Sequence, residues 1–152
     1  MSEDAAEAQP VLPPLDDPTR VDWLRLIRTE TIGPITFRLL VNRFGGAAAA
    51  LDALPEMSRR GGRAVVPPSR DAALREIDAL HRHGGHFVAL GEPDYPPALR
   101  HVDGPPPLLA VIGDATLLRR RAVSIVGSRD ASALGRRFAR DLATDLGAAG
   151  WA

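Results

Sequence analysis

Gly127, Ser128 and Arg129 follow directly after a short run rich in β-branched residues (122–126), and a stretch with helical periodicity comes next. This order predicts a strand-to-helix turn that carries a glycine, a hydroxyl and a guanidinium. Such turns bind anions, because the first N–H groups of the helix lack carbonyl partners and the helix dipole favours negative charge there. Arg129 can hold a phosphate through two parallel hydrogen bonds. The candidate ligands are a dinucleotide, a reacting phosphate group and a nucleic-acid backbone; the alternative is that Arg129 only caps a surface turn.

The spacing of glycines around this turn argues against a dinucleotide. A dinucleotide fold needs G-x-G-x-x-G, because its second glycine lets the backbone approach the pyrophosphate and its third lets helix and strand pack closely. After Gly127 the next glycine is Gly135. The phosphate loop of nucleoside triphosphatases requires a lysine, and all nineteen Lys and Arg positions of this chain are arginine. The pattern therefore predicts an anion-binding turn that takes no cofactor.

A cluster of histidines, His81, His83 and His86, invites a metal interpretation. Two histidines that share a metal on a helix lie four residues apart, whereas His81 and His83 are two apart and point to different sides. Histidine is also favoured near a helix C-terminus by the dipole. The aspartates of the second half lie in predicted turns, with no nucleophile to pair with. We therefore predict no metal, no catalytic residue and no enzyme activity.

Composition places the chain among globular proteins. It has 152 residues, 45% hydrophobic and 25% charged, and no cysteine, which excludes disulfides and thiolate catalysis and fits a cytoplasmic protein. No apolar run reaches the roughly 18 residues that a membrane helix needs, so no membrane partner is expected. The net charge is zero, yet residues 1–17 carry five acids and no base, whereas 119–140 carry seven arginines against one acid. The two ends therefore have opposite charge.

The pattern of the first half of the chain predicts a small helical domain that follows a disordered N-terminal leader. Residues 1–20 are acidic and rich in Pro and Ala, which predicts a disordered segment. From Val21 apolar residues recur at helical spacing, with a break at Gly33-Pro34, a short helix over 47–54, a loop that contains Pro55, and a last helix for which Ser69 is the N-cap. The predicted domain spans 21–84. The stretch 31–46 is compatible with a helix-hairpin-helix, a sterile-alpha-motif-like (SAM-like) domain or a plain bundle, and no DNA contact is assigned to it.

The pattern changes after Gly85 from helices to short apolar runs. Three runs, 87–90, 108–113 and 122–127, have the length of strands, and 133–147 carries an apolar stripe at steps of four that predicts an amphipathic helix. A parallel sheet needs another strand, which would begin at about Trp151, where the chain stops. We therefore expect an α/β fold in which 85–152 is the N-terminal part of an incomplete Rossmann-like domain.

Residues of this second region, taken in order, are similar to those of the DNA-processing protein A family, also called DprA or Smf. In that family a Tyr-Pro pair, a leucine and a proline-rich approach lead to a strand that ends in Gly-Ser-Arg. An aromatic residue often precedes the family's following glycine, and here that residue is Leu134. The matching positions are Tyr95, Pro96, Leu99, Pro106, Gly127, Ser128, Arg129, Ser132 and Gly135.

The resemblance implies single-stranded DNA binding and loading of the RecA recombinase during uptake and recombination of DNA. It implies an extended Rossmann domain, a DNA-binding site that includes Gly127, Ser128, Arg129 and Ser132, and a homodimer formed through parts beyond Ala152. Phosphate contact by arginine is independent of sequence, which suits a protein that must accept any incoming strand. The alternative is a Rossmann-like nucleotide-binding enzyme whose catalytic residues lie downstream.

Overall fold

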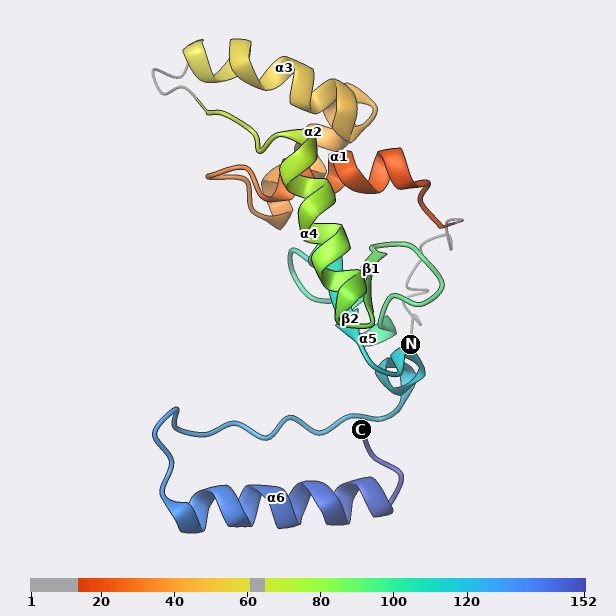
Figure 1. The fold of residues 1–152 in the computed structure, drawn as a ribbon, viewed down its shortest axis with the longest axis vertical. Coiled ribbons are helices and arrows are strands. Elements are labelled where there is room, and N and C mark those ends of the chain that lie inside the picture. Colours follow the sequence, from red (N-terminus) through yellow and green to blue (C-terminus); the bar gives the residue numbers. More distant parts are fainter. Residues whose placement is uncertain (1–13, 61–64) are drawn as a thin grey trace, which may run out of the picture. The chain divides into compact units, whose positions relative to one another are not determined.

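The computed structural model describes residues 14–60 and 65–152, which form two compact units, one that ends at Gly113 and one that spans Asp114–Ala152 (Figure 1). Residues 1–13, most of the predicted leader, lie outside the described residues. No helix of the described part is both long and apolar enough to cross a membrane. The first unit contains α1 (Asp17–Ile27), α2 (Pro34–Phe44), α3 (Ala47–Arg60), α4 (Arg70–Arg82), β1 (Gly85–Ala89), α5 (Pro97–Arg100) and β2 (Leu108–Ile112), and the second contains η1 (Ala115–Arg119) and α6 (Ala133–Ala148).

Helix α1 begins four residues before the helical domain was expected to start. The Asp16 side chain accepts a hydrogen bond from the Thr19 N–H at 2.9 Å, and Pro18 lies in the first turn, where its missing N–H costs nothing. Residues 17–20 are therefore helical, and the prediction of a disordered leader is wrong for them. The acidic and proline-rich composition that suggested disorder is, at these positions, the composition of a capped helix start.

The first three helices share one apolar core. It contains Leu26 of α1, Phe37 and Leu40 of α2, and Leu51 and Leu54 of α3, all less than 9% exposed. These helices are the ones predicted from apolar periodicity, and the break between the first two lies at Gly33-Pro34 as expected. Gly45 ends α2 with φ = +78°, a left-handed conformation that favours glycine.

Helix α3 extends six residues beyond the predicted end at Leu54, and it contains Pro55. The prediction of a loop at this proline is wrong. Proline lacks the N–H that would bond one turn back, which usually ends a helix. Here Met57 packs partly buried against the core after the proline, and Pro55 O accepts from the Ser58 hydroxyl at 3.2 Å. Burial of the helix face outweighs the single lost hydrogen bond.

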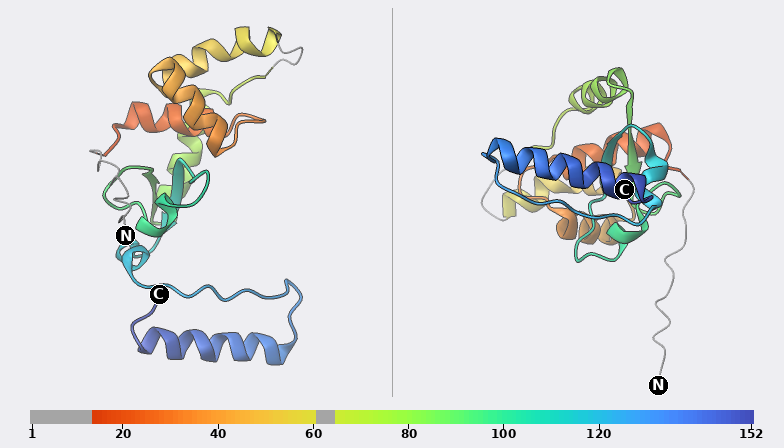
Figure 2. Two further views of the ribbon diagram at one scale, coloured as in Figure 1. Left: turned by 180° about the vertical axis from the view of Figure 1, so that it is seen from behind. Right: turned by 90° about the horizontal axis from the view of Figure 1, so that it is seen from below.

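A second apolar cluster lies on the other side of α1. It joins Val21 and Leu24 of α1 to Ala73 of α4 and Phe87 of β1, and α1 lies between α3 and α4 (Figure 2, left). The Ser69 hydroxyl accepts from the Ala72 N–H at 3.1 Å, which confirms the predicted cap of α4. Because β1 packs on the helices, the first compact unit extends to Gly113, past the boundary near 84 that the change of pattern suggested.

Strands β1 and β2 form an antiparallel pair in the register Gly85↔Ile112 to Ala89↔Leu108. Two of the three predicted strands are thereby confirmed, while this pair lacks the parallel arrangement of a Rossmann-like sheet. Gly85 is required by packing, because a Cβ there would lie 2.6 Å from Leu80 Cδ1 and 2.7 Å from Val111 O. The fold of the described residues is mixed α/β.

One buried ion pair ties α1 to the loop after β1. Glu92 is 6% exposed, and its carboxylate accepts from the Arg20 guanidinium at 2.8 Å and from the N–H groups of Leu15 and Ala89 at 2.8 and 2.6 Å. Arg20 also donates to the carbonyls of Phe87 and Leu15. Burial alone would raise the pKa of Glu92, but the hydrogen bonds from Ala89, Arg20 and Leu15 outweigh it, so this pKa lies below its ordinary value of 4.5.

This carboxylate should make the first unit sensitive to acid. A pKa depressed in the folded state contributes stability above pH 4.5, the ordinary value, and that stability is lost as the pH falls through the folded pKa. As the pH is lowered from 4.5 through the pKa of folded Glu92, wild type should lose more of its free energy of unfolding than Glu92→Gln does. Urea unfolding at each pH measures this loss. Parallel curves for the two proteins would contradict this role for Glu92.

The second unit contains η1, an extended run, a turn and α6. Asp114 caps η1 by accepting from the Thr116 N–H at 2.9 Å. Residues 122–127, predicted as a strand, are extended but belong to no strand, so that prediction is corrected: a strand requires a hydrogen-bonded ladder, and the described residues supply two bonds at one end. The Ala152 N–H donates to Arg121 O and the Val123 N–H donates to Ala152 O, both at 3.0 Å, a pattern that parallel strands use.

Candidate nucleic-acid interface

The Gly127-Ser128-Arg129 triplet lies between the extended run and α6, in the second unit (Figure 1). Arg129 is exposed, and its side chain has no hydrogen-bond or ion-pair partner among residues 14–60 and 65–152. The Ser128 hydroxyl accepts from the Asp130 N–H at 3.2 Å, which shapes the turn and leaves the hydroxyl proton free to donate. A Cβ at Gly127 would meet nothing within 4 Å, so the space beside this backbone is open.

Ser132 is the N-cap of α6. Its hydroxyl accepts from the Gly135 N–H at 3.2 Å, and its carbonyl accepts from the Arg136 N–H at 3.0 Å. The N–H groups of Ala133 and Leu134 lie in the first turn, where no carbonyl one turn earlier exists to accept from them. The start of α6 therefore offers free N–H donors next to Arg129 in the sequence, together with the positive end of the dipole of a 16-residue helix.

The charges around this helix start are mostly positive. Arg136 and Arg140 of α6 are exposed, and Arg137 approaches Asp141 at 3.8 Å, a long contact at the surface. Asp130 lies next to Arg129 in the turn and is the nearest acid in the sequence. Exposed cations on α6 and its preceding turn raise the local concentration of anions, and a phosphate backbone is such an anion.

The structure brings the four predicted site residues into one turn and one cap, all on the path from the extended run into α6. The predicted helix is confirmed, but the first half of its apolar stripe is exposed: Leu134 is 76% and Phe138 67% exposed, whereas Leu142 and Leu146 are half-buried. As for the histidines, no group of three or more possible metal ligands lies together in the described part of the chain. His81 and His86 instead line a cavity beside α1 together with Arg20 and Phe87.

Sequence reasoning missed a second cavity, in the first unit. It is lined by Trp23 of α1, by Arg38 and Asn42 of α2, and by Pro105 and Pro107. The spacing of Arg38 and Asn42, four residues apart on one helix, was a usable signal that both face the same side. Nothing in the sequence indicated that the proline segment folds back onto that face.

Comparisons with known proteins match both halves of the chain. Residues 17–79 match a DprA-like N-terminal HHH domain, and residues 86–152 match the DNA recombination-mediator protein A family. A DNA processing protein DprA from Bacillus subtilis (strain 168) is 31% identical over 78 residues, which is 51% of this chain and 26% of that protein. The matched segment thus spans about a quarter of the length of this relative.

The two matches cover the helical domain and the α/β region that follows it, in that order, and both point to the class of DNA-processing proteins. The chain belongs to the DNA-processing protein A (DprA) family, of which it contains the N-terminal portion. Between the alternatives that the sequence left open for the helical domain, the match favours the helix-hairpin-helix type.

Proposed function

We propose that this protein binds single-stranded DNA through phosphate contacts at the Gly127-Ser128-Arg129 turn, and that it loads a RecA recombinase onto incoming DNA during transformation and recombination. The observation that carries the proposal is the exposed Arg129, without a partner among the described residues, at the capped start of α6. Arg129 and the N–H groups of the first turn contact phosphate, Ser128 donates its hydroxyl proton, and Ser132 holds the helix start in place. None of these contacts depends on base identity.

The family match supports a role in DNA recombination. The parallel hydrogen-bond pattern between residues 121–123 and Ala152 supports a Rossmann-like arrangement of this region, in which the turn lies at the carboxyl end of a strand. We propose further that the role is not enzymatic and that the complete protein acts as a homodimer. The competing proposal, a nucleotide-binding enzyme, is favoured by the same turn geometry, because helix starts also bind the phosphates of nucleotides.

Arg129→Ala should weaken binding of a mixed-sequence single-stranded oligonucleotide by about 1–3 kcal/mol and reduce the salt slope by roughly one phosphate. Arg129→Lys should restore part of the loss, because an ammonium lacks the planar fork of the guanidinium. Fluorescence anisotropy over a salt titration measures both quantities. Arg75→Ala is the matched control, since it removes the same charge from an exposed arginine of α4 in the first unit, which is not part of the proposed site.

An unchanged affinity and salt slope in Arg129→Ala would contradict the assignment of the turn. Calorimetry with nicotinamide and flavin dinucleotides distinguishes the enzyme alternative. We expect no heat from either dinucleotide, because the second close glycine is missing. Micromolar binding of a dinucleotide without any response to DNA would favour the enzyme.

A further inference from the structure

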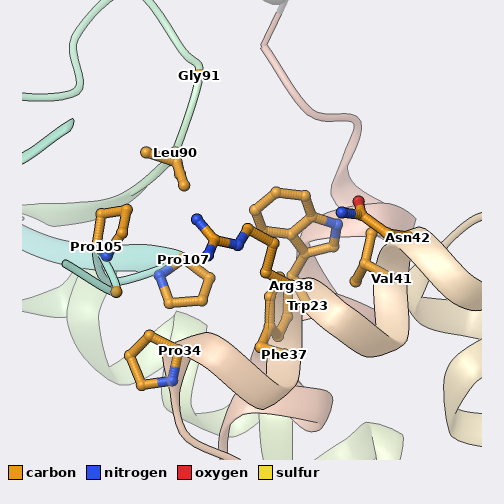
Figure 3. Close-up of a pocket in the computed structure, with 11 residues that line it drawn as sticks. Trp23, Pro34, Phe37, Arg38, Val41, Asn42, Leu90, Gly91, Pro105 and Pro107 are labelled. Carbon is orange, nitrogen blue, oxygen red and sulfur yellow. The ribbon is translucent and has the colours of Figure 1, made fainter. Parts of the chain in front are cut away.

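A cavity of about 330 Å³ lies in the first unit, and all the residues that line it belong to that unit. One side is made by Trp23 together with Arg38 and Asn42 of α2, and the other by Leu90, Pro105 and Pro107 (Figure 3). Figure 3 shows the Arg38 side chain reaching from α2 toward the wall of Leu90 and Pro107. Its size is at the lower end of the range for small-molecule sites, which fits one ring system rather than a large ligand.

Both walls of this cavity are held by packing. The Trp23 ring meets the Phe37 ring edge to face, with centroids 5.0 Å apart, and is thereby fixed against the core of the first three helices. On the opposite side the Leu90 N–H donates to Pro107 O at 2.9 Å, and Gly104 lies so close to Ile35 that a Cβ there would be 3.2 Å from Ile35 Cγ1. Prolines add rigidity because their φ is fixed. The cavity is therefore preformed.

The polar groups at the cavity are a cation and an amide. The side chains of Arg38 and Asn42 are exposed and have no partner within the part of the chain that the structure describes. None of the described residues that line the cavity carries a carboxylate, and α2 contains two arginines and no acid. A ligand that matches this site carries a flat apolar body, hydrogen-bonding groups on its edge and a negative charge nearby. An unpaired nucleotide has all three.

We propose that this cavity takes one unstacked base of single-stranded DNA, which contacts the Trp23 ring on one side and the prolines on the other. Asn42 hydrogen-bonds the edge of the base, and Arg38 contacts the adjacent phosphate. The proposal rests on single-stranded DNA as the partner of the proposed function, but it uses none of the residues of the Gly127-Ser128-Arg129 turn. It predicts a second, base-dependent contact in the helical unit.

Trp23 is itself the probe for this proposal. The chain contains two tryptophans, so Trp151→Phe leaves Trp23 as the single source of indole emission. In the Trp151→Phe chain, titration with an oligothymidine should quench this emission, because a base stacked on the indole provides a route for its excited state to decay. An abasic oligomer of equal length has the same phosphates and no bases, so it should bind through charge and leave the emission unchanged.

Variants of the exposed polar residues test the geometry without disturbing the core. Arg38→Ala should weaken binding of the oligothymidine about fivefold and reduce the salt slope by about one. Asn42→Asp places a carboxylate in the cavity and should abolish the quenching. Arg75→Ala, on α4 and outside the cavity lining, removes the same charge as Arg38→Ala and should leave the quenching intact.

The results separate this proposal from the proposed function. Base-dependent quenching that persists in Arg129→Ala, whatever that substitution does to affinity, supports the cavity. A loss of affinity in Arg129→Ala together with a Trp23 emission that does not respond to oligothymidine would overturn the cavity and leave the turn in place. Equal quenching by the abasic oligomer, or quenching only by an acidic peptide with an aromatic residue, would also overturn it.

Discussion

Replacing Arg20 with alanine should lower the free energy of unfolding of the first unit by about 3–5 kcal/mol. The guanidinium is the charge partner of Glu92, which is 6% exposed, and it also donates to the carbonyls of Phe87 and Leu15. Removing it leaves a buried carboxylate with two backbone donors and no counter-charge. Urea unfolding of the Trp151→Phe chain at neutral pH, followed by Trp23 emission, measures the change in the first unit.

Arg28→Ala is the matched control for this loss. Arg28 also joins a helix to a distant carboxylate, Glu76, at 2.7 Å, but both side chains are more than a third exposed. An exposed pair contributes at most about 1 kcal/mol. The double replacement Arg20→Met with Glu92→Leu should recover part of the loss, because it removes the unpaired charge but leaves the N–H groups of Leu15 and Ala89 without their acceptor. Equal, small losses in Arg20→Ala and Arg28→Ala would show that burial does not matter at this pair.

Tyr95→Ala should destabilise the same unit by about 3–5 kcal/mol, the usual cost of removing a buried aromatic ring. Tyr95 is 0% exposed and is the largest of the fully buried side chains in the described part of the chain. Its hydroxyl donates to Pro106 O at 2.8 Å and so holds the proline segment that forms one wall of the cavity. The unfolding measurement used for Arg20→Ala reports this change as well.

Tyr95→Phe separates the hydrogen bond from the ring. It keeps the packing and should cost about 1 kcal/mol, the net value of one hydrogen bond. The same substitution releases Pro106 O from the Tyr95 hydroxyl. Because this bond holds the proline wall of the cavity, Tyr95→Phe should also reduce the quenching of Trp23 emission by oligothymidine. A Tyr95→Ala protein as stable as wild type would contradict this prediction, because it would mean that the loop around Tyr95 folds without the buried tyrosine ring.

Much of the first unit could be predicted from apolar periodicity and caps. The four helices follow from the spacing of apolar residues, and Ser69 caps α4 with the hydroxyl geometry that its position implies. The errors have two causes. Pro55 lies inside α3 because the contact of Met57 with the core outweighs a local preference. Residues 17–20 are helical because Asp16 caps them and Pro18 suits a first turn, and Arg20 then pairs with Glu92.

The position of the candidate turn could also be predicted from the sequence, because it depends on neighbouring residues. Gly127, Ser128, Arg129 and Ser132 are close in the sequence, so the order of residues alone places them on one turn and one cap. The strand expected at 122–127 could not be predicted in this way, because a strand forms only with a partner. The described residues provide two backbone hydrogen bonds at its start. Whether this turn contacts DNA stays a prediction.

The sequence by itself determined the local features of this protein: the helices, their caps, the turn before α6 and the likeness to the DprA family. Those depend on interactions between residues a few positions apart, which periodicity and residue type report directly. Only the tertiary structure decided the antiparallel pairing of β1 with β2, the buried pair of Arg20 with Glu92 and the cavity at Trp23. Each of these joins segments that are distant in the sequence, and contacts over such distances depend on how the chain closes its loops, which no local pattern encodes.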